Sequence, residues 1–160
     1  MPDIISYIKS KVSKKSMGKA PQGLPKKIRI TDFSEAKQVK KPWGFELWLA
    51  KGKEVPYALK IIYLKKGAKT SLQYHNQKAE HNCILFGKVR FYYQSSKGKN
   101  IRSIDMTAGK VIKVMPPAVH RVEALTDVLL VEASTDHLDD VVRLADDYSR
   151  PNGKIASEHV

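Results

Sequence analysis

The sequence of 160 residues contains a single cysteine, Cys83. One cysteine excludes an intramolecular disulfide and a zinc cluster built from several cysteines. No run approaches the roughly 18 apolar residues that a membrane-spanning helix needs. The first residues also lack the apolar stretch of a secretory signal. G-x-G-x-x-G and Walker-type loops are absent as well, which excludes the common nucleotide-binding motifs. These absences predict a cytoplasmic protein that does not enter a membrane.

Acidic residues are scarce, with 16 Asp and Glu against 29 Lys and Arg, and the formal net charge is +13. This balance favours an anionic partner such as nucleic acid, anionic lipid or a phosphorylated small molecule. The apolar fraction of 42% is sufficient for a hydrophobic core and excludes global disorder. The length suits one compact domain with an additional arm.

The positive charge is concentrated near the N-terminus. Residues 1–41 hold eleven Lys and Arg against three Asp and Glu, a net charge of +8, which leaves +5 for the remaining residues. We therefore divide the chain into a basic arm and linker over 1–40, a domain over 41–150 and a C-terminal tail over 151–160. Within the arm we expect a short amphipathic helix over 3–15 and an irregular linker over 16–27. A solvated tail, or a segment docked on a partner subunit, is favoured over a contact with nucleic acid or lipid.

From Trp43 onward, short apolar runs recur about every ten residues and are separated by Gly, Lys-Gly and Pro-Pro. This pattern is typical of an antiparallel sandwich or barrel, so the fold class is all-β. One segment, 137–148, has the pattern of a short helix, with Ser134, Thr135 or Asp136 as its N-cap. The expected strands are 43–50, 56–64, 70–75, 78–86, 88–94, 101–106, 111–115, 119–125 and 128–133.

Four polar residues fall at a spacing that favours a metal site. Gln73 and His75 are two apart, so on one strand they point to the same face. Glu80 follows after a short turn, and His120 lies beyond the Pro116-Pro117 break. These side chains could converge inside one barrel, where two imidazoles and a carboxylate with open positions would suit a divalent transition metal. His81 is next to Glu80 and is expected to face the other side of the strand.

This spacing resembles the two cupin motifs. The first, G-x5-H-x-H-x3,4-E-x6-G, has its counterpart in Gly67-x5-Gln73-x-His75-x4-Glu80-x6-Gly87, with Gln73 in place of the first histidine. The second, G-x5-P-x-G-x2-H, keeps Gly109 and His120 but has Met115 and Pro117 at the Pro and Gly positions. The resemblance implies a cupin jelly-roll barrel, that is, a double-stranded β-helix.

Residues 41–150 resemble more narrowly the type II mannose-6-phosphate isomerase domain, which is usually fused behind a guanylyltransferase. The matching stretches include Lys41-Pro42-Trp43-Gly44, Ser71-Leu72-Gln73-x-His75, Ala79-Glu80-His81, His120-Arg121 and 139–150. The resemblance implies the metal ligands Gln73, His75, Glu80 and His120. Lys78 stands where the family has a catalytic arginine, so the charge is kept but the planar fork is lost. The guanylyltransferase domain is absent from this sequence.

The resemblance also implies an activity in carbohydrate or nucleotide-sugar metabolism. An aldose–ketose isomerase moves a proton between two sugar carbons through an enediolate, with a divalent metal as Lewis acid. Zinc is the first expectation, and manganese, iron, nickel or cobalt would also suit the donors. The expected partners are a phosphorylated sugar or nucleotide-sugar and a second copy of the chain in a homodimer. The candidate catalytic residues are Lys78, Lys60 and Arg121, and the candidate substrate-binding residues are Glu123, Arg143 and Arg150.

Other interpretations stay open at this point. Glu123 is also a candidate for the general base, and Lys60, Lys78 and Arg121 could instead hold a phosphate. A cupin with these ligands could bind sugar without turning it over, act on another sugar, or carry out iron(II) oxygenase chemistry. A nucleic-acid-associated protein acting through the arm ranks last, because no aromatic-basic motif or recognition helix accompanies the charge.

Overall fold

The computed structural model describes residues 6, 23, 25–51, 55–95 and 100–155. The chain divides into two compact units, Met1–Lys37 and Gln38–Val160. In the first unit the described element is a single 3-10 turn, η1 (Phe33–Glu35), which is capped by the Asp32 carboxylate accepting from the Ser34 N–H. The predicted helix over 3–15 and most of the predicted linker over 16–27 lie outside the described residues.

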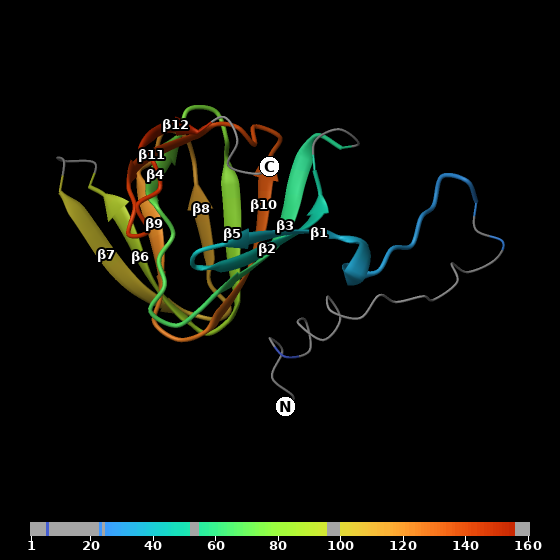
Figure 1. The fold of residues 1–160 in the computed structure, drawn as a ribbon, viewed down its shortest axis with the longest axis horizontal. Coiled ribbons are helices and arrows are strands. Elements are labelled where there is room, and N and C mark those ends of the chain that lie inside the picture. Colours follow the sequence, from blue (N-terminus) through green and yellow to red (C-terminus); the bar gives the residue numbers. More distant parts are fainter. Residues whose placement is uncertain (1–5, 7–22, 24, 52–54, 96–99, 156–160) are drawn as a thin grey trace. The chain divides into compact units, whose positions relative to one another are not determined.

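The second unit is built from strands arranged in two six-stranded antiparallel sheets, which face each other in Figure 1. One sheet has the order β1-β2-β3-β10-β5-β8, and the other has the order β12-β11-β4-β9-β6-β7. The strands are β1 (Lys37–Lys41), β2 (Gly44–Ala50), β3 (Tyr57–Leu64), β4 (Leu72–His75), β5 (Glu80–Phe86), β6 (Lys88–Gln94), β7 (Ile101–Thr107), β8 (Val111–Val114), β9 (His120–Ala124), β10 (Val128–Thr135), β11 (Val141–Ala145) and β12 (Gly153–Ile155).

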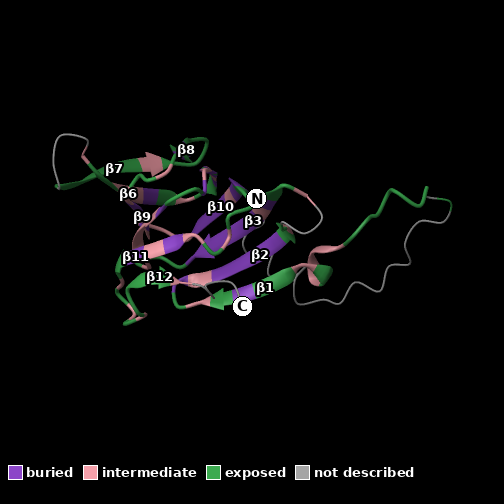
Figure 2. Ribbon diagram, turned by 90° about the horizontal axis from the view of Figure 1, so that it is seen from above, coloured by how far each residue is buried: buried purple, intermediate pink, exposed green. Residues whose placement is uncertain are grey.

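The core forms because apolar side chains recur at every second position of the inner strands. Leu130 and Val128 on β10 and Ile62 and Leu64 on β3 point between the sheets, where they pack with Ile84 of β5. Figure 2 shows buried residues along β2, β3 and β10, while β7 at a sheet edge stays exposed. The predicted all-β class and the strands expected from 43 to 133 are confirmed. Among the described residues, no helix is long and apolar enough to span a membrane.

The helix predicted over 137–148 is wrong. This segment contains strand β11, which pairs with β4 on one side and β12 on the other. Its side chains alternate, with Val141 and Arg143 buried and Val142 partly exposed between them. Two neighbouring valines have a β-branched preference for extended backbone, and pairing on both sides outweighs the helical spacing of the apolar residues. Strand β12 also lies in the segment predicted as a tail.

Candidate metal centre and ligand pocket

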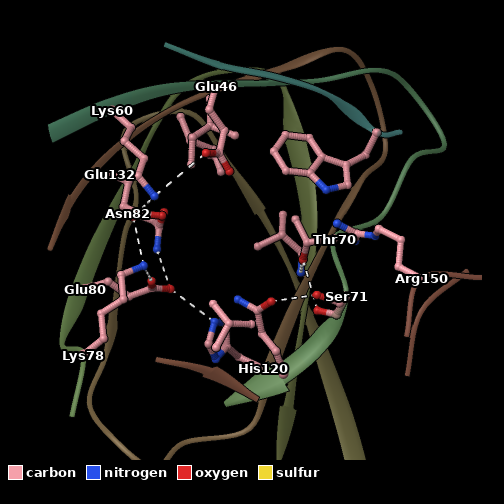
Figure 3. Close-up of a pocket in the computed structure, with 16 residues that line it drawn as sticks. Glu46, Lys60, Thr70, Ser71, Lys78, Glu80, Asn82, His120, Glu132 and Arg150 are labelled. Carbon is pink, nitrogen blue, oxygen red and sulfur yellow. Dashed lines mark hydrogen bonds and ion pairs between the residues drawn. The ribbon is translucent and has the colours of Figure 1, made fainter. Parts of the chain in front are cut away.

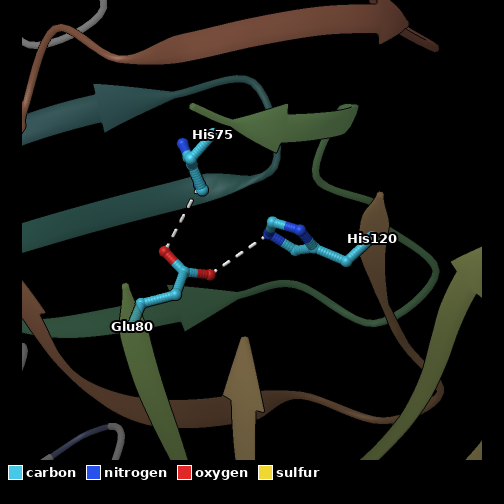
Figure 4. A group of neighbouring side chains, drawn as sticks. All are labelled: His75, Glu80 and His120. Atoms are coloured by element: carbon cyan, nitrogen blue, oxygen red, sulfur yellow. Dashed lines mark ion pairs between the residues drawn. The ribbon is translucent and has the colours of Figure 1, made fainter. Parts of the chain in front are cut away.

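Three strands bring two histidines and a glutamate together (Figure 4). His75 ends β4, Glu80 begins β5 and His120 begins β9. The His120 Nε2 atom lies 3.1 Å from Glu80 Oε1, and the His75 Nε2 atom lies 3.5 Å from Glu80 Oε2. One ligand atom from each of the three residues lies within 4.8 Å of the others, and all three side chains are buried. The sequence-predicted convergence of these residues is therefore present in the structure.

The donor set fits a divalent metal ion. The Nδ1 atoms of His75 and His120 lie 3.1 Å and 3.0 Å from the carbonyl oxygens of Asp140 and Ala118. A carbonyl oxygen only accepts, so Nδ1 carries a proton in both rings, and Nε2 is the ring atom that faces Glu80. The His75 Nε2 atom is buried without a hydrogen-bond partner. A buried nitrogen without a partner beside a carboxylate and a second imidazole is what a metal ligand requires before the metal binds.

Asp140 fixes the position of His75 through the turn between β4 and β5. Its carbonyl accepts from His75, and its carboxylate accepts from the backbone N–H groups of Gln77 and Lys78. Burial opposes ionisation, but these hydrogen bonds stabilise the carboxylate and lower the pKa of Asp140 to about 2. The turn that separates the two strand ends is therefore tied to the loop before β11.

Gln73, the fourth predicted ligand, lies on the same side as His120. The two residues are directly opposite each other in the β4–β9 pair. The Gln73 side-chain oxygen accepts from Ser71 Oγ at 2.7 Å, and both residues line the pocket that contains Glu80 and His120. The structure thus brings all four predicted ligands to one region, although the amide oxygen of Gln73 is hydrogen-bonded to Ser71.

A chain of buried charges continues from Glu80 across its own sheet, toward β10, β3 and β2. We call its members Glu46, Lys60, Glu132, Lys78 and Glu80 the ion network. Lys78 Nζ donates to Glu80 Oε2 at 2.6 Å and to Glu132 Oε1 at 3.0 Å. Lys60 Nζ lies 3.2 Å from Glu132 and 3.9 Å from Glu46. Lys60 also lies over the Trp48 ring, 4.3 Å from its centroid. Burying so many charges is costly unless they are paired, and here each has an opposite partner.

The strand register explains how this network forms. Trp48, Lys60, Glu132 and Asn82 occupy directly opposite positions along β2, β3, β10 and β5. Directly opposite residues of antiparallel strands point to the same face, so a polar row crosses the otherwise apolar inner face of this sheet. Asn82 Nδ2 donates to Glu80 Oε1 at 3.2 Å and connects the row to the candidate metal centre.

The charges of the ion network stabilise each other. Burial opposes the ionisation of Glu80, but the charge of Lys78 and the adjacent His120 and His75 side chains hold the pKa of Glu80 well below its usual range. Burial likewise opposes the charge on Lys78, and the neighbouring Glu132 and Glu80 raise the pKa of Lys78. Burial would lower the pKa of His120, but its hydrogen bond to Glu80 raises it. Lys78 therefore retains its proton, which disfavours a role as general base.

The ion network and the candidate metal centre border one pocket, which is shown in Figure 3. The pocket opens to solvent, and the space between its lining residues, counted with that open part, is about 620 Å³. Its walls combine the charged residues with apolar side chains, among them Trp43, Ile62 and Leu130. Arg150 borders the pocket on the side opposite Lys60 and Glu132 in this view, with its guanidinium bonded to Asp146 at 2.6 Å.

The remaining predicted site residues divide into two groups. Lys60, Lys78 and Arg150 line the pocket, whereas Arg121, Glu123 and Arg143 are not among its described lining residues. Arg121 donates to the Thr70 carbonyl and pairs with Asp147, and Glu123 accepts from the Tyr92 hydroxyl. Arg143 is buried and donates to the Pro151 carbonyl. The predicted roles of these three residues at the pocket therefore stay predictions.

Sequence reasoning missed Glu46, Asn82 and Glu132. The signal for Glu132 was available, since Val128, Leu130, Glu132 and Ser134 alternate as the inward positions of one apolar strand. A charge at an inward position of a buried strand indicates a buried partner. Glu46 has the same kind of position between Phe45 and Leu47. The identity of each partner depends on strand pairing between segments far apart in the chain.

Known proteins match the chain by family and by fold. Residues 30–146 match the family described as mannose-6-phosphate isomerase C-terminal. No curated protein sequence matches. Among solved structures, the capsular polysaccharide assembling protein CapF from Staphylococcus aureus aligns with a TM-score of 0.60 at 16% identity, over 69% of this chain and 32% of that chain. A variant of Bacillus subtilis oxalate decarboxylase aligns with a TM-score of 0.61 at 21% identity, over 74% of this chain and 33% of that chain.

A third match is the Lactobacillus farciminis oxalate decarboxylase in a formate complex, with a TM-score of 0.58 and 15% identity over 69% of this chain and 34% of that chain. At these identities the likeness shows the fold and not the activity. The chain spans about a third of the length of these relatives. The paired sheets and these neighbours confirm the predicted cupin jelly roll.

Proposed function

The chain belongs to the mannose-6-phosphate isomerase C-terminal family of cupins, and we propose that it is a metal-dependent enzyme that interconverts the aldose and ketose forms of a phosphorylated sugar. The observation that carries this proposal is the buried group of His75, Glu80 and His120 beside a pocket lined by charged and apolar side chains. Gln73 completes the proposed ligand set from the strand position opposite His120.

A divalent metal held there, with zinc as the first expectation, would act as a Lewis acid toward the oxygens of the substrate. The chain's own residues then have separable roles. Lys78 and Asn82 orient the Glu80 carboxylate, because both donate to it. Lys60 and Lys78 line the pocket and can donate hydrogen bonds to the hydroxyl groups of the sugar. Arg121 is bonded to the Thr70 carbonyl and Glu123 to the Tyr92 hydroxyl. Lys60 and Lys78 are therefore the candidate catalytic residues that border the pocket.

The test is proton NMR of the metal-supplemented full chain with mannose 6-phosphate in heavy water. We expect fructose 6-phosphate to form, with deuterium entering the reacting carbons, since an isomerase of this type exchanges the transferred proton with solvent. The double variant His75→Ala, His120→Ala should form no product, whereas His81→Ala should behave as wild type because His81 is exposed and outside the group. Absence of conversion and exchange by metal-loaded wild type would overturn the isomerase proposal for this sugar.

A sugar-binding cupin without turnover is the second candidate. It is favoured by one observation: Lys78 stands where the family has arginine, and its ammonium group already bridges Glu80 and Glu132. Saturable binding of mannose 6-phosphate in the same NMR samples, without product or deuterium exchange, would support this alternative. Restored turnover in Lys78→Arg would identify the lysine as the reason for the missing activity.

A further inference from the structure

The lysines that line the pocket are already neutralised. Lys60 and Lys78 share Glu132 as a partner, at 3.2 Å and 3.0 Å, and each has a second carboxylate, Glu46 for Lys60 and Glu80 for Lys78. All five side chains of the ion network are buried, so solvent screens their interactions little. With three carboxylates against two ammonium groups, the network by itself carries one net negative charge.

This charge balance decides which part of a ligand can bind next to the ion network, a phosphate or a sugar hydroxyl. A phosphate dianion brought against the network would meet the repulsion of Glu46, Glu132 and Glu80 at short range in a weakly screened site. A sugar hydroxyl brings no net charge, can donate to a carboxylate oxygen and can accept from an ammonium group. The network is therefore suited to a polyhydroxylated ring and unsuited to its phosphate.

We propose that the ion network closes its side of the pocket to phosphate and receives the hydroxyl groups of a neutral sugar ring, with Glu132 as the specificity-determining residue. The phosphate or diphosphate of the ligand then lies on the other side, which Arg150 borders in Figure 3 and where the ion pair of Arg150 with Asp146 carries no net charge. The identity of the ligand as a sugar rests on the proposed function. The exclusion of phosphate rests only on the contacts of the ion network.

Glu132 is singled out because it is the one carboxylate of the network shared by both lysines. Glu132→Gln keeps the shape of the side chain and removes its charge, which leaves Lys60 with Glu46 at 3.9 Å and Lys78 with Glu80. The network would then carry no net charge, with the ammonium of Lys60 weakly paired. The variant should admit an anion where the wild type rejects it.

The first test is calorimetric titration of inorganic phosphate into the full chain after dialysis against a chelator, at constant ionic strength. We expect wild type to show no saturable binding below about 10 mM. Glu132→Gln should bind phosphate at least about tenfold more tightly, and adding Lys60→Met to it should abolish the gain. Asp105→Asn is the matched control, because it also releases a cation, Arg90, but on the exposed surface of the second sheet.

Two results would overturn the proposal: tight phosphate binding by wild type that is lost in Lys60→Met, or a Glu132→Gln variant that binds phosphate no better than Asp105→Asn. A thermal melt and an amide NMR spectrum establish that each variant is folded. If Glu132→Gln does not fold, the phosphate titrations of wild type and Lys60→Met still test the proposal. Phosphate affinity should differ between these two proteins only if phosphate reaches the ion network.

The second test uses the metal-loaded full chain with mannose and mannose 6-phosphate. We expect Arg150→Gln to reduce the affinity advantage of the phosphorylated sugar and Lys60→Met to leave that advantage unchanged; the reverse pattern would contradict the proposal. If neither sugar binds wild type, the proposed function fails, and the result with inorganic phosphate still supports or overturns the exclusion of anions by Glu132.

Discussion

Glu80 is the residue on which the candidate centre depends, because it contacts both histidines and Lys78. One carboxylate oxygen lies 3.1 Å from His120, and the other lies 3.5 Å from His75 and 2.6 Å from the Lys78 ammonium. The ammonium and a metal would therefore share the same carboxylate. A dication near an ammonium is held less tightly than one near a carboxylate alone. The strength of metal binding should thus depend chiefly on the two neutral imidazoles.

The double variant His75→Ala, His120→Ala should lose its metal. Removing both imidazoles leaves Glu80 as the one anionic donor of the group. Removing a residue that only hydrogen-bonds to a metal ligand lowers metal affinity about 10- to 100-fold. Removing two ligands themselves should lower metal affinity more. Elemental analysis after gel filtration, with zinc, manganese, iron, nickel and cobalt offered in turn, measures the bound metal.

His81→Ala is the matched control for this measurement, because His81 follows Glu80 directly but points to the exposed side of β5. It should retain metal at the level of wild type. Full retention by the double variant, or equal loss in the control, would mean that the metal binds elsewhere.

At the scale of single residues, the sequence was sufficient to predict that His75, Glu80 and His120 lie together, but not which residues surround them. The proximity of His75 and Glu80 could be predicted because they end and begin two strands joined by one short turn. His120 joins them from β9 through the pairing of β9 with β4, and it was found from the resemblance to the second cupin motif. Lys60 and Glu132 are 72 positions apart and meet only because β3 and β10 pair directly. Such a contact depends on sheet order, which periodicity along one segment does not specify.

At the scale of elements, two turns between strands depend on glycine, and they do so for different reasons. Gly87, between β5 and β6, and Gly109, before β8, both have a backbone φ of +90°. A Cβ atom at Gly87 would lie 2.2 Å from the Asp127 carbonyl oxygen, whereas one at Gly109 would meet nothing within 4 Å. An alanine at Gly109 would therefore add backbone strain alone, whereas an alanine at Gly87 would add the same strain and a steric clash.

We expect Gly109→Ala to lower the free energy of unfolding by about 1–2 kcal/mol, which is the strain of a left-handed backbone alone. Gly87→Ala should lower it clearly more, by about 3 kcal/mol or beyond, because the chain next to Asp127 must also move. Urea denaturation of both variants measures the difference. An equal decrease in the free energy of unfolding for both variants would contradict this prediction, because it would mean that the chain at Asp127 moves aside without loss of stability.

The segment after β11 is organised by Asp146. Its carboxylate accepts from the backbone N–H groups of Tyr148 and Arg150 and from the Arg150 guanidinium. Burial opposes ionisation of this carboxyl, but the hydrogen bonds from Arg150 lower the pKa of Asp146 below its usual value of 3.8. The pKa is thus lower in the folded chain than in the unfolded chain, so the stabilisation is present above about pH 4 and is lost as the pH falls through the folded value.

Asp146→Asn should therefore destabilise the fold at pH 7 by about 1–3 kcal/mol. The difference from wild type should shrink as the pH is lowered from 5 toward 3, because the wild-type carboxyl becomes protonated in turn. Denaturation curves at several pH values measure this trend. A difference that stays constant with pH would show that the ionised form of Asp146 contributes nothing.

Strand identity was the part of the fold that the sequence specified well, and the segment at 137–148 shows where it failed. The strands from β2 to β10 have alternating inward apolar residues bounded by turns, so their existence could be predicted. Val141, Val142 and Leu144 have a spacing that suits a helix equally well. The choice was decided by β4 and β12, which offer hydrogen-bond partners on both sides. A local sequence pattern does not show which strands from other parts of the chain will pair with a segment.

At the scale of the whole molecule, the sandwich leaves one long strand open to solvent. Strand β7 is the last strand of its sheet, and all its residues except Met106 are exposed. Ile101 and Ile104 are 44% and 52% exposed on it. An edge strand with exposed apolar side chains is a template for pairing with another chain. The predicted homodimer therefore has a specific candidate interface.

We expect light scattering after size-exclusion chromatography to give a mass twice that of the 18.1 kDa chain. Ile104→Lys should shift the mass toward that of a monomer, because a buried lysine at a strand–strand contact would be desolvated without a partner. Leu144→Lys is the matched control: Leu144 is 43% exposed, but it lies on β11, which has strands on both sides. A monomeric wild type would remove the homodimer, and a dimer that persists in Ile104→Lys but not in Leu144→Lys would place the interface away from β7.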